Sequence, residues 1–394
     1  MPQLPLEGMT VVALEQAVAA PFATRQLADL GARVVKIERP GDGDFARGYD
    51  RTVRGLSSYF VWLNRSKESL TLDLKQPEAL DVLHSLVARA DIFVQNLAPG
   101  AADRLGLSPA TLRARHPSLI VCSVTGYGSS GPYASKKAYD LLVQAETGLV
   151  SITGSPGEPA KVAISIADIA AGMYAFTGIL TALVQRGRTG VGAVVEVSLF
   201  DALAEWMSQP AYFTAFSGRA PARTGPRHAS IAPYGPFMTA DATPVLLGIQ
   251  NEREWERFCA EVMGRPELAL DSRFSSNSDR VRHRDELEPL VNEVLATQSA
   301  AETIERLERA GIACARMNSV EQFLDHPQLA ARARWTRISS PVGTLDALLP
   351  PVTLDDLAPQ MGGVPALGEH TSRILGELGV DAETVAGWRA RGIV

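Results

Sequence analysis

The feature that most constrains this chain is an alternation, over its first 200 residues, of short β-branched runs with segments of helical pattern. Two runs, Met9–Glu15 and Arg33–Glu38, flank a predicted helix at Pro21–Leu30, which has Pro in its first turn and Gly31 after its end. The alternation continues with predicted strands at Leu70–Leu74, Ile92–Gln95 and Leu119–Val124 and a helix at Pro77–Ala88. Alternating strands and helices form βαβ units, so the sequence predicts an α/β fold with a Rossmann-like large domain around a mainly parallel sheet.

Between Val162 and Val184 the chain is apolar and rich in Ala and Gly, with Asp168 as its single acid. This composition predicts a buried helix, followed by a buried strand at Val194–Leu199 and a helix that begins near Asp201. An unpaired carboxylate is costly in such surroundings. Two interpretations of Asp168 remain open on these grounds: a carboxylate that caps the amides of a helix N-terminus, or a functional acid in a desolvated site.

The composition changes after about Pro210, where Pro, Gly and Arg cluster through Pro236 and predict a linker between domains. A strand at Pro244–Ile249 and helices at Arg253–Met263, Arg284–Leu295 and Ala300–Ala310 then predict a smaller α+β domain. After Pro327 the chain has few strand signals and a last helix near Glu369–Gly379. We therefore assign residues 1–215 to the N-terminal part of the large domain, 216–325 to the small domain and 326–394 to a segment that returns to the large domain.

The composition argues against several functional classes. A chain of 394 residues with 46% hydrophobic and 21% charged residues is typical of a compact globular protein, and a net charge of -6 disfavours a nucleic-acid partner. The three cysteines are far apart and the six histidines have no metal-ligand spacing, so we expect neither disulfides nor a metal. We see no N-terminal signal segment and no apolar run near the roughly 20 residues of a membrane span, and we expect a cytoplasmic protein with no membrane partner.

Familiar nucleotide and hydrolase motifs are missing. The Gly-x-Gly-x-x-Gly fingerprint is absent after the first predicted strand, where the chain reads Glu15–Pro21, and there is neither a P-loop nor a Gly-x-Ser-x-Gly elbow. Dehydrogenase, kinase and serine-hydrolase functions are therefore disfavoured. A carboxylate is the group that remains to carry chemistry.

Several segments, in order along nearly the whole chain, resemble the family III CoA-transferases, the family of formyl-CoA transferase and carnitine CoA-transferase. The segments that carry the resemblance are Leu6–Val12, Ala28–Glu38, Asn64–Lys67 with Asp73, Gln95–Gly100, Gly126–Gly128 with Gly131–Pro132, and Tyr139–Asp140. The resemblance implies an enzyme that moves coenzyme A from an acyl-CoA thioester to a free carboxylic acid, with no tightly bound cofactor. It also implies an interlocked homodimer with the active site where the large and small domains meet.

By this resemblance Asp168, which precedes Gly172 by four residues, corresponds to the nucleophilic aspartate of the family. The implied chemistry is attack on the thioester carbonyl to give a mixed anhydride, followed by an aspartyl-CoA thioester. The resemblance also implies a set of coenzyme A contacts. These are the cations Arg39, Lys75, Arg104 and Lys137 for the phosphates, with Gln16, Ala17, Leu72, Asn96, Leu97 and Tyr139 near the adenine, pantetheine or thioester.

One departure from formyl-CoA transferase bears on the substrate. That enzyme has a run of glycines where this chain reads Gly248–Trp255, so the sequence is closer to members that act on carnitine or on short dicarboxylates such as succinate, mesaconate and itaconate. Succinyl-CoA is the donor that this similarity suggests. The candidates to meet a second carboxylate are Arg47, Tyr49, Arg227 and His228, and each is equally consistent with a linker or interface residue.

Two other functions remain as alternatives. The α-methylacyl-CoA racemases share the fold and move a proton with a His and an Asp, but this chain has Ala138-Tyr139-Asp140 where they have Gly-His-Asp. Tyrosine, with an ordinary pKa near 10, replaces imidazole poorly as a proton relay at neutral pH. The second alternative is a protein that binds acyl-CoA without turning it over, which the retained aspartate disfavours.

Overall fold

The computed structural model describes residues 3–355 and 357–394. By the contacts among its residues the chain separates into two compact units, and each is described by itself. Unit 1 contains the described residues up to Gly148, Val162–Ser208 and the described residues from Leu329 to Val394, and unit 2 contains Leu149–Lys161 and Gln209–Gln328. Unit 2 therefore begins a few residues before, and ends a few residues after, the sequence-based limits of 216 and 325. It also includes Leu149–Lys161, because this segment bonds to the start of the small domain: Gly225 N–H donates to Gly154 O, and Arg223 Nε donates to Ser155 O.

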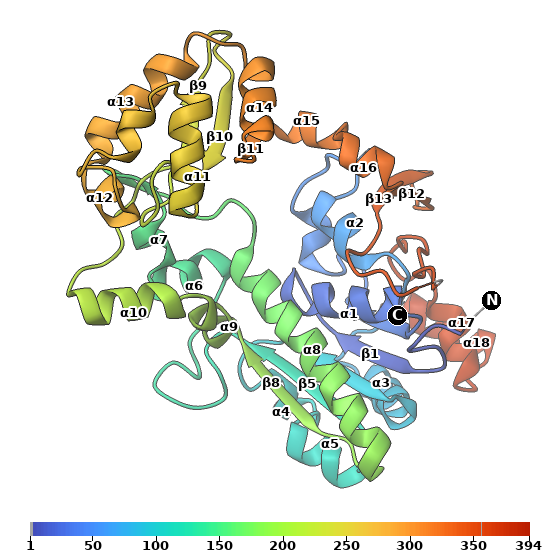
Figure 1. The fold of residues 1–394 in the computed structure, drawn as a ribbon. Coiled ribbons are helices and arrows are strands. Elements are labelled where there is room, and N and C mark those ends of the chain that lie inside the picture. The colour runs from blue at the N-terminus through green and yellow to red at the C-terminus, as the bar shows by residue number, and fades with distance from the viewer. Residues whose placement is uncertain (1–2, 356) are drawn as a thin grey trace. The chain divides into compact units, whose positions relative to one another are not determined.

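Unit 1 is built around a parallel sheet, of which β1, β5 and β8 are labelled in Figure 1. Among the described residues its strand order is β3-β2-β1-β4-β5-β8. Its strands are β1 Thr10–Leu14, β2 Arg33–Glu38, β3 Lys67–Thr71, β4 Ile92–Gln95, β5 Ile120–Thr125 and β8 Val194–Ser198. Every pairing in it is parallel, with Val11 opposite both Val34 and Ile92. The strand order reverses between β1 and β4, which is the switch point at which doubly wound sheets bind ligands.

Helices cover both faces of this sheet. Alternate strand residues such as Val12, Leu14, Val35 and Ile37 form one core with α3 and with the C-terminal helices α17 and α18. On the other face α1 and α8 pack against one another and against the strands. The helices of unit 1 are α1 Ala19–Asp29, η1 Phe45–Gly48 (a short 3-10 helix), α2 Ser58–Asn64, α3 Pro77–Arg89, α4 Ala101–Arg104, α5 Pro109–Arg115, α6 Asp140–Glu146, α8 Ile166–Thr189, α9 Leu199–Trp206, α16 Pro327–Ala331 (its first two residues in unit 2), α17 Thr371–Glu377 and α18 Ala382–Ala390.

Unit 2 is an α+β unit with an antiparallel sheet of order β11-β10-β9. Its core lies between this sheet and α11, α13 and α14, and centres on Trp255, Phe258 and Phe274. Its elements are α7 Leu149–Ile152, the pair β6 Gly154–Ser155 and β7 Glu158–Pro159, α10 Ser208–Ser217 (starting in unit 1), β9 Tyr234–Met238, β10 Pro244–Gly248, α11 Glu252–Arg257, η2 Phe258–Val262, η3 Pro266–Ala269, α12 Asn277–Arg282, α13 Arg284–Leu295, α14 Ala300–Arg309, β11 Ala313–Arg316 and α15 Val320–Leu324. The predicted fold class, a Rossmann-like parallel sheet with a smaller α+β part, is confirmed.

Several local predictions were wrong. Strand β8 is half exposed, with Val194 43% accessible, because it is the edge of the sheet and has a neighbour on one side only. The predicted linker begins with a helix, α10. The C-terminal segment holds a hairpin, β12 Trp335–Ile338 with β13 Leu345–Leu348, and α18 follows the helix that we expected to be the last.

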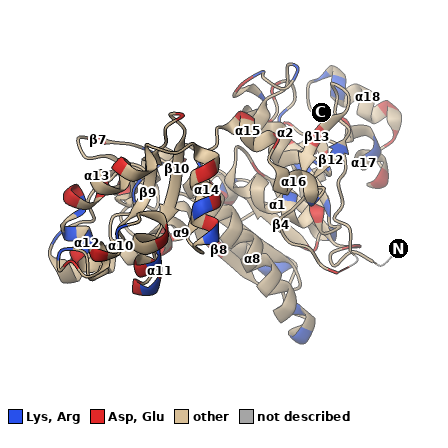
Figure 2. Cartoon of the chain, turned by 45° about the horizontal axis from the view of Figure 1, so that its top comes forward, with Lys and Arg blue, Asp and Glu red and all other residues tan. Residues whose placement is uncertain are grey.

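Helix α8 is buried on one face only. Ala167, Ala171, Ala175 and Ile179 recur at helical spacing and face the protein, whereas Val184 is exposed. Figure 2 shows it uncharged over much of its length, with basic residues at its C-terminal end. Contrary to the sequence-based expectation, α8 is long and apolar enough to cross a membrane by length and composition alone, a property that core helices of soluble proteins share.

Candidate active site

The switch point of the parallel sheet carries three predicted site residues. The chain leaves β1 at Gln16 and Ala17 and leaves β4 at Asn96, and these segments are bonded to each other. Gln16 N–H donates to Asn96 Oδ1 at 2.8 Å, and Asn96 Nδ2 donates to Gln16 O at 2.8 Å. Asn96 therefore fixes the backbone of the turn that follows β1.

A cavity of about 740 Å³ opens along the carboxyl ends of β1, β2, β3 and β4. Its volume lies in the range of small-molecule sites. The lining includes six of the predicted coenzyme A contacts, which are Gln16, Arg39, Leu72, Lys75, Leu97 and Arg104. Residues that are distant in the sequence meet here because parallel strands bring their carboxyl ends to one edge of the sheet.

The cations around this cavity are available for an anion. In the part of the chain that the structure describes, Arg39, Lys75 and Arg104 form no ion pair, and all three are exposed. The acids of the inner wall, in contrast, already have partners: Glu38 accepts two bonds from Arg47, and Asp44 accepts from Lys36. The cavity thus combines unpaired positive charge at its rim with apolar surface from Leu72 and Leu97, which suits a ligand with phosphates and an apolar arm.

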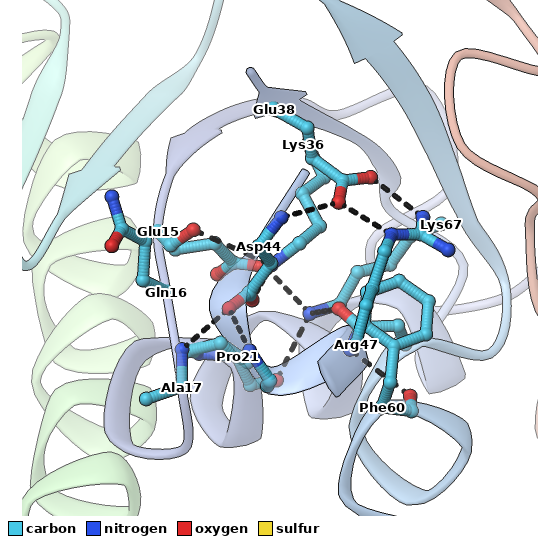
Figure 3. A network of polar contacts seen from close by, with 12 residues as sticks. Glu15, Gln16, Ala17, Pro21, Lys36, Glu38, Asp44, Arg47, Phe60 and Lys67 are labelled. Atoms are coloured by element: carbon cyan, nitrogen blue, oxygen red, sulfur yellow. Dashed lines mark hydrogen bonds and ion pairs between the residues drawn. The ribbon is translucent and has the colours of Figure 1, made fainter. Parts of the chain in front are cut away.

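Behind the cavity lies a buried network of alternating charges (Figure 3). Lys36 Nζ contacts Asp44 Oδ2 at 2.8 Å and Glu15 Oε1 at 3.3 Å, and Lys67 Nζ contacts the same Glu15 oxygen at 2.7 Å. These four side chains are fully buried. Burial alone would raise the pKa of Glu38, next to this group, but the bonds from Arg47 and the charge of Lys36 outweigh it and hold that pKa at about 2.

Asp168 lies in the first turn of α8, and its carboxylate has no hydrogen-bond or ion-pair partner among the described residues. Asp140 does the capping instead: its Oδ1 accepts from Ala167 N–H at 2.7 Å and from Asp168 N–H at 3.3 Å, and its Oδ2 accepts from Gln144 at 2.7 Å. Burial, and after it the charge of Asp140, raise the pKa of Asp168 to about 7. The structure therefore does not show Asp168 as the helix cap, which was one of the two interpretations left open.

Gly172 brings α8 against the start of α1. A Cβ at Gly172 would lie 2.6 Å from the carbonyl oxygen of Ala19, so the contact requires a residue without a side chain. Asp168 lies one helical turn before Gly172 on the same side of α8. The spacing of the two residues thus directs Asp168 toward the residues that connect β1 to α1.

Tyr49 belongs to the same neighbourhood. Burial, and after it the charges of Asp44 and Asp168, raise the pKa of Tyr49 to about 12. The ring of Tyr49 meets that of Tyr59 edge to face, with centroids 5.4 Å apart. Its hydroxyl is therefore a neutral donor at physiological pH.

Three other predicted residues are not among those that line the cavity. Lys137 and Tyr139 are exposed and do not line the cavity, although Tyr139 directly precedes the capping Asp140. Arg47 is bound to Glu38 and stacks 3.6 Å from the ring of Phe60, so its guanidinium is already engaged.

Arg227 and His228 belong to unit 2. Arg227 Nε bonds Glu288 at 2.8 Å, and the ring of His228 stacks on Tyr234 at 5.2 Å.

Sequence reasoning missed the residues that hold the site. In the sequence Asp140 stands out only as part of the Tyr139-Asp140 motif, and no pattern distinguishes the other network residues, which are Glu15, Lys36, Asp44 and Lys67. The two lysines lie in strands that read as half-polar, and no pattern in the sequence says that their ammonium groups meet the same acids. Among the described residues no group of His, Cys, Asp and Glu could hold a metal ion.

Comparison with known proteins gives one consistent result. Residues 6–371 match the model of CoA-transferase family III. The acetyl-CoA:oxalate CoA-transferase of Acetobacter aceti is 38% identical over 333 residues, which cover 84% of this chain and 85% of that protein. The succinate–glutarate CoA-transferase of Agrobacterium fabrum is 32% identical and covers 95% of this chain and 96% of that protein.

A solved structure agrees. The CAIB/BAIF family protein of Brucella suis, 33% identical, superposes with a TM-score of 0.83 and covers 96% of this chain and 100% of that one. The region matched by the family model contains the switch point, Asp168 and all the residues that line the cavity except Gly392. The chain belongs to CoA-transferase family III and is a CoA-transferase.

Proposed function

We propose that this enzyme transfers coenzyme A between short dicarboxylic acids through a covalent intermediate on Asp168, with succinyl-CoA as a donor. The observation that carries the proposal is the carboxylate of Asp168, which is unpartnered, desolvated to a pKa of about 7 and directed toward the turn at the switch point. A carboxylate with these properties is less solvated than an ordinary one and is therefore a stronger nucleophile. The dicarboxylate class is supported by relatives named for oxalate and glutarate.

In the first half of the reaction a carboxylate oxygen of Asp168 attacks the thioester carbonyl. The C–S bond breaks, which gives a mixed anhydride and the thiolate of coenzyme A. The thiolate then attacks the Asp168 carbonyl of the anhydride, which releases the donor acid and leaves an aspartyl-CoA thioester. The acceptor carboxylate then attacks the carbonyl of the aspartyl-CoA thioester, which gives a second mixed anhydride and releases the thiolate of coenzyme A. The thiolate attacks the acceptor carbonyl of this anhydride, which forms the product thioester and regenerates free Asp168.

We propose that the cavity at the carboxyl edge binds the coenzyme A portion. Arg39, Lys75 and Arg104 would meet its phosphates, and Leu72 and Leu97 would contact the adenine or the pantetheine. The cavity follows the strand ends as far as Gln16. A coenzyme A bound in this way would therefore extend its pantetheine arm toward the Gln16–Ala17 turn, which Asp168 faces.

The test is trapping with hydroxylamine. The protein is incubated with succinyl-CoA and then with hydroxylamine, which converts an aspartyl thioester or anhydride to a hydroxamate, and peptide mass spectrometry locates the modified residue. We expect modification at Asp168 alone, and none without succinyl-CoA. Asp168→Ala should lose transfer and the adduct and still bind coenzyme A.

The same experiment addresses the isomerase alternative. If no acyl-CoA in a panel modified Asp168, and the protein exchanged the α-proton of a thioester in deuterated water, the racemase function would replace the transferase mechanism. The exposed Tyr139 in place of an imidazole argues against that outcome.

We also propose that the protein is a homodimer. Exposed apolar side chains continue from α8 to α9 within unit 1: Tyr174, Val184 and Trp206 are 37%, 60% and 45% accessible. A second copy of the chain would cover such a surface. Light scattering at micromolar concentration should give twice the chain mass, and a monomer would contradict this proposal.

A further inference from the structure

The turn between β1 and α1 has an unusual backbone and two external tethers. Ala17 has φ 62, a left-handed conformation that residues with a side chain seldom adopt. Asn96 holds Gln16, and the N–H of Ala17 donates to Asp44 Oδ1 at 3.0 Å. A conformation of this kind costs about 1 kcal/mol or more and persists only where the surroundings impose it.

Asp44 is the side chain that imposes the left-handed conformation on Ala17. Its Oδ1 accepts from both Ala17 N–H and Ala46 N–H, and its Oδ2 accepts from Lys36 at 2.8 Å. The backbone N–H of Asp44 in turn donates to Glu38 Oε1 at 3.0 Å. With only 2% of its surface accessible, Asp44 has one available orientation.

Lys36 connects this tether to the rest of the network. It lies between Asp44 and Glu15, and Glu15 is also held by Lys67 and by the hydroxyl of Thr24 at 2.6 Å. Buried ion pairs of this kind add little to stability compared with apolar packing, but they fix orientation. In this network the oriented group is the Asp44 carboxylate, and it points at the turn that lines the cavity (Figure 3).

We propose that Asp44 is a positioning residue of the transfer reaction: locked by Lys36, it holds Ala17 in the left-handed conformation and so fixes the Gln16–Ala17 turn where the thioester meets Asp168. The inference rests on the proposed function of Asp168 and of the cavity. Asp44 itself need not touch the substrate, because it acts through the backbone of Ala17.

The experiment compares Asp44→Asn with a matched control, Asp29→Asn. Asparagine has one acceptor oxygen where aspartate has two, so it cannot accept from both Lys36 and Ala17. Asp29 is an equally buried carboxylate that bonds Arg25 and Arg65 and makes no contact with the turn. We expect Asp44→Asn to lower kcat about a hundredfold, the effect of a misplaced reacting group, with the KM for acyl-CoA within about threefold. Asp29→Asn should keep kcat within about twofold, because it weakens the bonds to Arg25 and Arg65 and so lowers only the free energy of unfolding.

Two further variants keep the inference falsifiable if Asp44→Asn does not fold. Asp44→Glu keeps the charge opposite Lys36 but displaces the acceptor by one methylene, so it should fold and still lose kcat about tenfold or more. Ala17→Gly in the Asp44→Glu background should recover most of that loss in kcat, because glycine adopts positive φ without a tether.

Rates are measured with whichever acyl-CoA and acid the wild-type protein turns over, beginning with exchange of labelled succinate into succinyl-CoA. Equal kcat values for Asp44→Asn, Asp44→Glu and Asp29→Asn would overturn the inference, as would the absence of any recovery by Ala17→Gly. Failure of the proposed function has a different signature, an unmodified Asp168 in the trapped wild-type protein. The two failures are therefore distinguishable.

Discussion

Replacing Asp168 by asparagine should stabilise the protein, and the gain should grow with pH. The pKa of Asp168 rises from an ordinary value of 3.8 to about 7, so between these values the folded protein binds more protons than the unfolded chain. Stability therefore falls as pH rises through this window and levels off above about 7. Asparagine has no charge to bury, and the carboxylate that it replaces has no bond to lose.

The magnitude follows from the shift. About three pKa units at about 1.4 kcal/mol each correspond to about 4 kcal/mol at pH 8 for an unscreened group. Asp168 is partly accessible, and solvent screening reduces this to about 2 kcal/mol. At pH 5, where the folded state keeps its proton, the same argument gives about 1 kcal/mol.

The assay is urea unfolding of both proteins at pH 5 and pH 8, at one protein concentration. Asp140→Ala serves as the control of opposite sign, because it removes a charge from the same site but also removes the cap of α8, with an expected loss of about 1 kcal/mol at pH 5. A gain for Asp168→Asn that was equal at the two pH values, or a loss of stability at pH 8, would refute the reasoning.

Three further results are expected. The proposed attack requires ionised Asp168, so kcat/KM should rise about tenfold per pH unit below about 7 and level off above it. A flat profile from about pH 5.5 to 8.5 would contradict the proposed mechanism. Lys75→Ala and Arg104→Ala should each raise the KM for acyl-CoA about tenfold, with kcat within about twofold, in initial-rate measurements; the reverse pattern would exclude the cavity as the coenzyme A site. Gly172→Ala should lower the free energy of unfolding by about 2 kcal/mol and reduce kcat, because the added Cβ meets a backbone oxygen. Gly178→Ala, on the same helix, meets only the side chain of Val195 and should lower stability and kcat less. Thermal unfolding and initial rates measure the two effects.

The parallel sheet could be predicted because its signals are local. The buried strand Ile92–Gln95 reads as an almost continuous apolar run, and Arg33–Glu38 has β-branched residues between its charged ones. Both were placed with the bounds that the structure has. The helix at Pro77 begins where the proline indicates. The errors arose where burial decides the structure: β8 reads as a buried strand but lies at the edge of the sheet.

The candidate site, too, could be predicted in part. The predicted coenzyme A contacts followed from a family resemblance along the chain, and six of these residues line one cavity. Lys137 does not, since it lies on an exposed connection before α6. Arg47 was a candidate to bind a substrate carboxylate, but it forms an ion pair with Glu38. No pattern in the sequence predicts which cation a given acid will contact in the fold.

The sequence by itself determined the order of strands and helices, the family and the single acid in an apolar helix, because periodicity, composition and short motifs are properties of neighbouring residues. The tertiary structure decided the pKa and the orientation of that acid. Burial and the charge of Asp140, a residue 28 positions away, set its pKa, and the approach of Gly172 to Ala19 sets its direction. The same holds for Asp44, whose tether to Ala17 spans 27 positions and depends on a lysine in a neighbouring strand. Electrostatic energies depend on distance in space and on exclusion of water, and both are fixed only when the chain has folded.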